Sequence, residues 1–311
     1  MSRYYFIVNA VAGSGRSGDW FERAAAEMAN RGMNFAFDYT DGVDHAARLA
    51  AAAVERGEQA IVSVGGDGTA REVASSLVNT GVPMGVFPFG TGNDFASALG
   101  LKVDPIGALE DLLRATPVPI DAAMANDRVY INAAGTGFDV DVIHNTEKFK
   151  RRFNGMLPYM LGILKSLMHL KPFRITVTVD GEAFEEEALL FDACNGPRFA
   201  GGINVAPIAA LNDGLLDVCI LKKLGIIGFL MLLPSFVKGK HLGSPHIRYF
   251  KAKEIRLESS RESTLNLDGE LGSSTPVTFK ILPGALTMLL PPQGRGKCAS
   301  DVTKLATRER L

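Results

Sequence analysis

The stretch Ala60-Ile-Val-Ser-Val-Gly-Gly-Asp-Gly-Thr69 decides the first part of the fold. Its β-branched run from Ile61 to Val64 predicts a buried strand, and its glycines predict a sharp turn before a helix that Thr69 caps. The first N–H groups of a helix have no partner within it, and the helix dipole adds partial positive charge there. The stretch therefore indicates either an anion-binding turn or an ordinary strand-to-helix connection.

Two further stretches repeat this pattern of strand, small turn and helix. One is a strand over residues 4–8 with a Gly/Ser-rich turn up to Arg16, and the other is a strand over residues 84–88 followed by Phe89-Gly-Thr-Gly-Asn-Asp-Phe-Ala96. Alternating strands and helices predict a parallel sheet, whose ligands bind beyond the carboxyl ends of the strands. We therefore expect a Rossmann-like α/β domain over residues 1–121, with all three glycine turns on one rim.

The alternation of strands and helices ends at Thr116-Pro-Val-Pro-Ile-Asp121, where two prolines indicate a domain boundary. Short alternating or β-branched runs follow, and they predict an all-β sandwich domain over residues 122–292. The last two predicted strands cover residues 277–282 and 285–290. Residues 148–170 are an exception, because this apolar segment is predicted to be helical. The polar tail, residues 293–311, is expected either to pack back on the first domain or to extend freely.

Composition limits the partners and the compartment. The 311 residues include 33 Lys and Arg against 34 Asp and Glu, and this formal charge of -1 gives no basic field for nucleic acid. Three widely spaced cysteines, Cys194, Cys219 and Cys298, suit neither a disulfide framework nor a zinc site. The first ten residues lack the pattern of a secretory signal. We therefore expect a cytoplasmic protein.

Two apolar segments are candidates for contact with a membrane surface. Residues 224–237 are apolar but interrupted by glycine and proline, and they fall short of the ~20 residues that a spanning helix needs. Lysines on both sides suit an interfacial helix beside anionic headgroups, whereas a buried helix with charged ends is an equal alternative. Residues 148–170 allow the same two interpretations.

Four motifs together resemble the diacylglycerol kinase catalytic family, which also holds sphingosine and ceramide kinases and bacterial lipid kinases. They occur in the family's order and approximate spacing across nearly the whole chain. The motifs are Val64-Gly-Gly-Asp-Gly-Thr69, Pro88-Phe-Gly-Thr-Gly-Asn-Asp-Phe-Ala96, Asn212-Asp-Gly-Leu-Leu-Asp217 and Asn266-Leu-Asp-Gly-Glu270.

The resemblance implies an ATP-dependent kinase that transfers the γ-phosphoryl group to a lipid hydroxyl in a cleft between the two domains. Diacylglycerol is the expected acceptor and phosphatidic acid the expected product. The enzyme is expected to associate peripherally with a membrane, where its lipid substrate lies, and a homodimer is a further expectation because relatives of this kind are often dimers.

The resemblance also implies roles for individual residues. Asp268 is expected to be the general base for the acceptor hydroxyl, with Glu270 orienting it. Asp67 and Asp121 are expected to hold the catalytic Mg²⁺ through water. The expected nucleotide-binding residues are Asn9, Ser14, Arg16, Gly65, Gly66, Asp67, Gly68, Thr69, Gly90, Thr91, Asn93 and Asp94.

A second, structural Mg²⁺ site is implied at Asp213 and the main-chain carbonyl of Leu215. Ala210 stands where relatives supply a side-chain ligand, so this site is expected to be weaker or absent. Arg198, in a glycine-rich loop that resembles one near the family's interdomain cleft, is a candidate phosphate contact.

Two other functions remain open at this stage. NAD kinases share the Gly-Gly-Asp-Gly-Thr turn and a β-sandwich partner, although the Gly-Thr-Gly-Asn-Asp and Asp-Gly-Glu motifs count against them. A non-catalytic nucleotide- or lipid-binding protein of the same fold is the third alternative, since motifs do not guarantee turnover.

Overall fold

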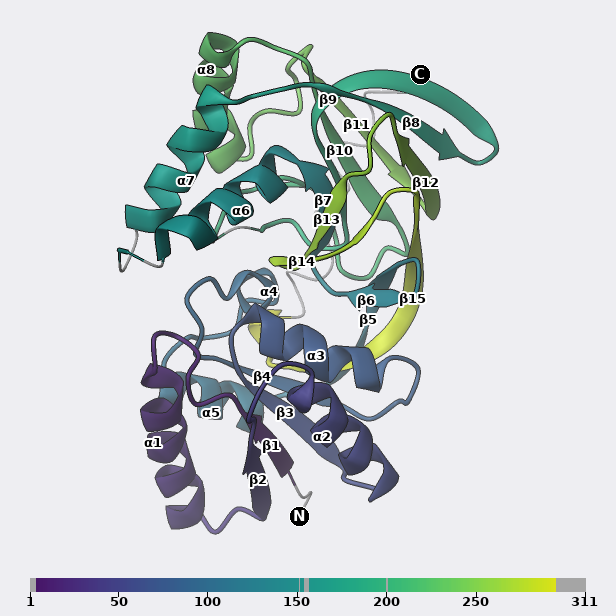
Figure 1. Ribbon diagram of the computed structural model, residues 1–311. Coiled ribbons are helices and arrows are strands. Elements are labelled where there is room, and N and C mark those ends of the chain that lie inside the picture. The colour runs from purple at the N-terminus through teal and green to yellow at the C-terminus, as the bar shows by residue number, and fades with distance from the viewer. Residues whose placement is uncertain (1–3, 151, 154–156, 200, 295–311) are drawn as a thin grey trace.

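The computed structural model describes residues 4–150, 152–153, 157–199 and 201–294. An α/β part that contains the N-terminus lies at the bottom of Figure 1, and a β-rich part lies above it. The predicted fold class, an α/β domain followed by a β-sandwich domain, is confirmed. The second part also carries helices, which line the left side of the view, and the helix predicted within residues 148–170 is among them.

The first part is a parallel sheet covered by helices on both faces. Its strands lie in the order β2, β1, β3, β4. The elements are β1 (Tyr4–Val8), α1 (Arg16–Asn30), β2 (Phe35–Tyr39), α2 (His45–Glu55), β3 (Ala60–Gly65), α3 (Asp67–Leu77), β4 (Met84–Pro88), α4 (Asp94–Ala98) and α5 (Pro105–Leu113).

Alternation along β1 explains why this sheet needs two layers of helices. Tyr5 and Ile7 belong to a core that includes residues of α2 and α3. Phe6 and Val8 belong to a second core that includes residues of α1 and α5. Successive side chains of a strand point to opposite faces, so a continuous apolar strand must be buried on both sides.

The second part is a β-sandwich whose outer face carries helices. Phe191 and Ala193 point into the sandwich core, while Leu190 and Cys194, on the other face of the same strand, pack against residues of α7 and α8. The elements are β5 (Thr116–Ala125), β6 (Arg128–Tyr130), β7 (Ala133–Gly137), α6 (Phe138–Lys150), α7 (Leu157–Met168), β8 (Phe173–Val179), β9 (Glu182–Cys194), β10 (Leu216–Lys222), α8 (Ile226–Val237), β11 (Ile247–Ala252), β12 (Glu254–Ser259), β13 (Thr264–Leu267), β14 (Glu270–Ser274) and β15 (Val277–Leu290).

Two long strands join the parts. The predicted boundary at Asp121 falls inside β5, which continues through both prolines and pairs antiparallel with β15. The two strands predicted over residues 277–282 and 285–290 are one strand, β15, with a register shift between Leu282 and Leu286. Met288 pairs in parallel with Met84 of β4, so the end of β15 extends the first sheet.

The helices differ from the prediction in extent. The predicted helical segment at 148–170 contains α7, but α6 begins ten residues earlier, at Phe138. None of the helices in the described part of the chain has both the length and the hydropathy that a membrane-spanning helix requires. Of the tail, Gln293 donates a 2.8 Å hydrogen bond to Asp111 of α5, and residues 295–311 lie outside the described residues.

Candidate active site

The three glycine turns lie against one another at the carboxyl ends of β1, β3 and β4, as expected. A Cβ added to Gly90 would overlap the Cα of Gly66, and one added to Gly13 would overlap the carbonyl oxygen of Phe89. The turns therefore touch through their main chains, which only residues without a side chain permit.

A side-chain contact links the first two turns. The Asn9 amide nitrogen Nδ2 donates to Thr69 Oγ1 at 3.1 Å. Gly66 is the N-cap of α3, so Thr69 lies inside the first helical turn and the prediction that it caps the helix is wrong. Asp67 and Gly68 already have helical backbone, and their N–H groups point out of the helix start.

Asp67 holds the third turn against the second. Its Oδ2 accepts the N–H of Asp94 at 3.1 Å and its Oδ1 accepts the N–H of Phe95 at 3.0 Å. These two N–H groups are the first amides of α4. The side chain of the N-cap residue Asn93 does not cap them, because it is hydrogen-bonded to the main chain of Gly90. Each carboxylate oxygen of Asp67 keeps a lone pair for a further donor or a cation.

A loop of the second domain closes on this corner. The N–H of Gly201 donates to Asp94 Oδ2 at 2.7 Å, and Arg198 Nη1 donates to Ser97 Oγ at 3.1 Å. Burial raises the pKa of Asp94, and the nearby charge of Asp67 adds to this rise, while the Gly201 N–H opposes it. The two domains therefore meet beside a pair of carboxylates, Asp67 and Asp94.

Asp268 lies in the tight hairpin turn between β13 and β14. Asp268 and Gly269 both have positive φ, 51° and 95°, as a two-residue type I′ turn requires. The Asp268 carboxylate accepts three main-chain N–H groups, from Ile131 to Oδ2 at 2.7 Å and from Asn132 and Ala133 to Oδ1 at 2.9 Å each. Burial raises the pKa of Asp268 to about 6, against the lowering effect of these N–H groups.

Glu270 connects this hairpin to the central glycine turn. It forms a salt bridge with Arg71 of α3, and its Oε1 would lie 3.1 Å from a Cβ added to Gly68. Arg71 is buried, and its charge lowers the pKa of Asp268. The Asp-Gly-Glu motif of the second domain therefore lies directly against the Gly-Gly-Asp-Gly-Thr turn of the first.

Asp121 is placed differently from its expected partner. Its buried carboxylate accepts the N–H of Gly214 at 2.7 Å and the N–H of Gly284 at 2.8 Å. Burial raises its pKa, and these N–H groups oppose the rise. Asp67 instead accepts the N–H groups of Asp94 and Phe95, so a shared role of Asp67 and Asp121 in holding Mg²⁺ stays a prediction. Nowhere in the described residues do three or more metal-ligating side chains gather.

The residues of the expected structural Mg²⁺ site fit a lysine better than a divalent ion. Lys251 Nζ lies 2.6 Å from Asp213 Oδ2 and 3.2 Å from Asp217 Oδ2. The other Asp213 oxygen accepts the N–H of Leu215 at 3.1 Å. Burial lowers the pKa of Lys251, but the carboxylates of Asp217 and Asp213 outweigh this and raise it. Ala210 offers only a methyl group, so the ammonium supplies the positive charge that the acids require.

Three of the expected nucleotide contacts have exposed side chains. Ser14, Arg16 and Thr91 are exposed. Arg16 Nε donates to Gly13 O at 3.1 Å, and the guanidinium lies 5.6 Å from the centre of the Trp20 ring. Their contact with a nucleotide stays a prediction.

Sequence reasoning missed the residues that join the motifs. Arg71 carried a usable signal, because it lies four residues after Asp67 and hence on the same face of a helix. Asn195 carried none. Its buried Nδ2 binds the carbonyl oxygens of Asp121, at 3.1 Å, and Ile131, at 2.7 Å, which are far from it in sequence.

Comparison with known proteins yields two adjacent family matches. Residues 3–125 match the diacylglycerol kinase catalytic domain, and residues 132–290 match the YegS C-terminal NAD kinase beta sandwich-like domain. The resemblance to NAD kinases is therefore limited to the sandwich domain, whose family is named as NAD kinase-like.

The chain is also similar to other proteins over most of its length. A diacylglycerol kinase of Bacillus subtilis (strain 168) is 33% identical over 276 residues, which are 88% of this chain and 89% of the relative. A diacylglycerol kinase of Staphylococcus aureus (strain bovine RF122 / ET3-1) is 29% identical, over 93% and 92% of the two chains. A crystal structure of a diacylglycerol kinase from Bacillus anthracis str. Sterne has a TM-score of 0.72 at 24% identity, covers 94% and 98% of the two chains, and shows the same fold.

Proposed function

Because this chain belongs to the diacylglycerol kinase catalytic domain family and is a lipid kinase, we propose that it transfers the γ-phosphoryl group of ATP to diacylglycerol. The acceptor hydroxyl oxygen bonds to the γ-phosphorus as the bond to the bridging oxygen of ADP breaks. The hydroxyl proton passes to a base, and the products are phosphatidic acid and ADP. The names of the relatives support the choice of diacylglycerol.

One observation carries the proposal. Glu270 of the hairpin lies over Gly68 and binds Arg71, so the candidate base, two residues earlier, lies beside the start of α3. Phosphoryl transfer depends mainly on positioning and on neutralising charge. This arrangement offers both within one corner of the molecule.

The phosphate side of the reaction relies on main-chain groups. The N-terminus of α3 presents N–H groups and partial positive charge, and Gly66 and Gly68 leave room for a phosphate to approach the backbone. Arg71 adds a fixed positive charge on the same helix. These groups stabilise the negative charge of the γ-phosphate before and during transfer.

The carboxylates near the turns suit Mg²⁺, which takes oxygen ligands and keeps several waters. Asp67 Oδ2 and Asp94 Oδ2 both lie near Gly92, at 3.1 Å and 3.7 Å from a Cβ placed there. Burial raises the pKa of Asp94 and the charge of Asp67 raises it further, and a cation would relieve the repulsion between the two carboxylates. Asp67, with Asp94 as its neighbour, would hold the ion, whose charge would help to neutralise the phosphates.

Asp268 is suited to accept the hydroxyl proton. Its Oδ2 accepts only one of the three main-chain N–H groups and so keeps a lone pair for the acceptor. A pKa of about 6 leaves the carboxylate ionised near neutral pH and still basic enough to take a proton. Glu270 and Arg71 fix the hairpin that presents it.

One assay tests the proposal. The protein is incubated with γ-labelled ATP and Mg²⁺, in separate reactions, with diacylglycerol, sphingosine or phosphatidylglycerol in mixed micelles, or with NAD. We expect labelled phosphatidic acid to form fastest, and no label when Mg²⁺ is chelated. Faster labelling of another acceptor would reject diacylglycerol, and the absence of any labelled product would reject the kinase activity itself.

A further inference from the structure

Two buried carboxyl groups that the proposed reaction does not use lie behind the Asp268 hairpin. Asp139 is the second residue of α6, and Asp192 lies in β9. They are 8% and 1% exposed. Burying a carboxyl group is costly unless its oxygens find partners, so this pair requires an explanation.

Strand pairing places Asn266 and Asp192 on one face of the sheet, with a glycine between them. Asn266 of β13 lies opposite Gly135 of β7, and Gly135 lies opposite Asp192 of β9. Residues opposite one another on neighbouring strands share a face. A Cβ added to Gly135 would overlap Asp192 Oδ1. The Asp192 carboxyl therefore leans over the glycine, toward Asn266.

Asn266 connects Asp139 to the hairpin. Its Oδ1 accepts the N–H of Gly269 at 2.9 Å, and its Nδ2 donates to Asp139 Oδ2 at 2.9 Å. The N–H of Gly269 requires an acceptor, so the nitrogen of the Asn266 amide faces Asp139, and Asp139 Oδ2 carries no proton. Gly269 directly follows Asp268 in the tight turn. A chain of hydrogen bonds therefore runs from Asp139 to the turn that carries the candidate base.

One oxygen of each carboxyl group lacks a partner. Asp139 Oδ1 and Asp192 Oδ2 are buried and have no hydrogen bond with the residues that the structure describes. Buried polar atoms in proteins nearly always have partners. A single proton between these two oxygens would give a partner to each of them.

The surroundings assign the proton to Asp192. Burial raises the pKa of Asp139 to about 6, while the Asn266 amide and the first N–H groups of α6 oppose the rise. Burial raises the pKa of Asp192 well above its usual range, and the charge of Asp139 adds to the rise. When two carboxyl groups interact strongly, one of them stays protonated, and here Asp139 has the donors that stabilise a negative charge.

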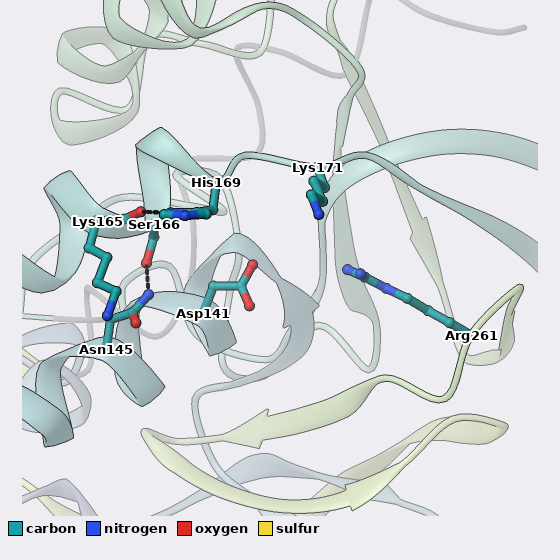
Figure 2. A pocket seen from close by; sticks show the side chains of 7 residues that line it. All are labelled: Asp141, Asn145, Lys165, Ser166, His169, Lys171 and Arg261. Atoms are coloured by element: carbon teal, nitrogen blue, oxygen red, sulfur yellow. Dashed lines mark hydrogen bonds between the residues drawn. The ribbon is translucent and has the colours of Figure 1, made fainter.

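The other ionisable groups nearby agree with this assignment. Burial raises the pKa values of Cys194 and Cys219, so both thiols are neutral. The charge of Asp141, two residues after Asp139, adds to the rise in the Asp139 pKa. Asp141 itself lines the pocket shown in Figure 2, where Arg261 faces it and partly offsets the effect of burial on its pKa.

We propose that Asp139 and Asp192 share one proton between Asp139 Oδ1 and Asp192 Oδ2, and that this pair positions the Asp268 turn by holding Asn266. Both acids are positioning residues, because they act on Asp268 only through Asn266 and Gly269. The shared proton is a property of the folded chain alone. Its effect on turnover rests on the proposed function, in which Asp268 is the base.

Infrared difference spectroscopy tests the shared proton without any catalytic readout. A protonated carboxyl group has a C=O stretch that an ionised carboxylate lacks. At a pH of about 8, above the ordinary pKa of any Asp or Glu, subtracting the spectrum of Asp192→Asn from that of wild type should leave this band. Asp192→Asn has nearly the shape of the protonated acid and should fold. Absence of the band would mean that both carboxyl groups are ionised and would overturn the shared proton.

Hydrogen exchange of the Gly269 amide tests the positioning chain. Asp192→Ala leaves Asp139 Oδ1 without a partner, so Asn266 is held less firmly and the Gly269 N–H should exchange about tenfold faster. Asp192→Asn keeps an N–H donor that faces Asp139 and should exchange like wild type.

The matched control for Asp192→Ala is Cys219→Ala. Cys219 is buried directly opposite Asp192 on β10 and has no hydrogen bond to Asn266. Its removal should leave exchange at Gly269 unchanged. Slow exchange in Asp192→Ala, or equal acceleration in Cys219→Ala, would refute the chain.

Turnover measured well below Tm tests the link to the base. A base that is less well placed lowers kcat, so Asp192→Ala should lose about 10- to 100-fold in kcat with an unchanged KM for ATP. Asp192→Asn and Cys219→Ala should keep the wild-type kcat. Fast exchange at Gly269 with a normal kcat would reject the role in positioning the base. Lack of turnover in wild type would instead reject the proposed function, and the spectroscopic and exchange results would still decide the pair.

Discussion

Asp268 has two tasks that use the same carboxylate. It fixes the main chain before β7 by accepting three N–H groups, and it is the proposed base for the acceptor hydroxyl. The structural task accounts for its position, since a residue with φ of 51° in a tight turn is held by these bonds. The chemical task depends on the lone pair that remains.

Replacing Asp268 by Asn should therefore affect turnover and stability unequally. We expect kcat to fall by about 10²- to 10⁴-fold, as the loss of a general base requires. An amide has a single acceptor oxygen, so at least one N–H loses its partner at a cost of about 1–3 kcal/mol, and Tm should fall by a few degrees. Lipid phosphorylation and a thermal melt measure the two effects.

The control for this variant is Asp127→Asn, in the exposed turn between β5 and β6. It removes the same charge close by and should leave both kcat and Tm unchanged. Turnover near the wild-type value in Asp268→Asn would rule out its assignment as the base.

The raised pKa of Asp268 predicts an acid limb in the pH–rate profile. Only the ionised form accepts a proton, so kcat should fall about tenfold per pH unit below a pKa of about 6.

The same pKa affects stability. The pKa of Asp268 in the folded chain exceeds the value of about 3.9 for an unfolded Asp. Protonation of Asp268 therefore favours the folded chain, and this contribution is complete below pH 4 and is lost as the pH rises through 6.

Arg71→Gln should move this limb to higher pH. The Arg71 charge lowers the Asp268 pKa, so its removal raises that pKa further. Arg114→Gln, an exposed arginine of the same domain, is the control and should leave the profile unchanged. A limb that stays in place in Arg71→Gln would mean that another group controls the acid side of the profile.

At the scale of elements, the three turns form one unit because they lack side chains where they touch. The backbone of Gly90 is not in the left-handed region, so its conformation does not require a glycine. A glycine is needed there because the main chain of Gly66 leaves no room for a side chain. An added methyl group would push the third turn away from the start of α3. Asp67 would then lose its contacts with the first amides of α4.

Gly90→Ala should consequently weaken nucleotide binding. Overpacking of this kind costs about 1–3 kcal/mol, so we expect the Kd for ATP, measured by titration calorimetry, to rise about 10-fold or more. Gly42→Ala is the matched control, because a Cβ there meets no atom within 4 Å. Wild-type affinity in Gly90→Ala would show that contact between the turns is not needed to bind nucleotide.

At the scale of the molecule, β15 makes the two domains interdependent. Its first half belongs to the sandwich and pairs with β12, while its second half pairs with β4 of the parallel sheet. Leu286, Met288 and Leu290 are buried in the core of the first domain, although they come from the far end of the sequence.

A fragment of residues 1–125 should therefore fail to fold cooperatively. Three buried side chains contribute roughly 5–9 kcal/mol, which is comparable to the whole stability of a domain. Fusing residues 277–292 through a flexible linker should restore a cooperative thermal transition, measured by circular dichroism. The same fusion with Leu286, Met288 and Leu290 changed to Ser should not. Cooperative unfolding of the unfused fragment would refute this dependence.

The sequence by itself determined the glycine turns, the parallel sheet and the motifs that identify the family. These features are local, since strand periodicity, turn glycines and helix starts follow from residues within a few positions of one another. Bounds were accurate for β1 and β4, whose patterns are strong. No strand was predicted at β11 or β14, because most of their side chains are only partly buried and give no strong apolar pattern.

Only the tertiary structure decided which motifs touch. Glu270 pairs with Arg71, and Asp94 accepts the N–H of Gly201. Lys251 pairs with Asp213, and Asp121 accepts the N–H groups of Gly214 and Gly284. The tertiary structure also carried the end of β15 into the first sheet. These contacts join residues that are far apart in the chain, and they form because buried charges and open sheet edges must find partners wherever the packing of the cores places them.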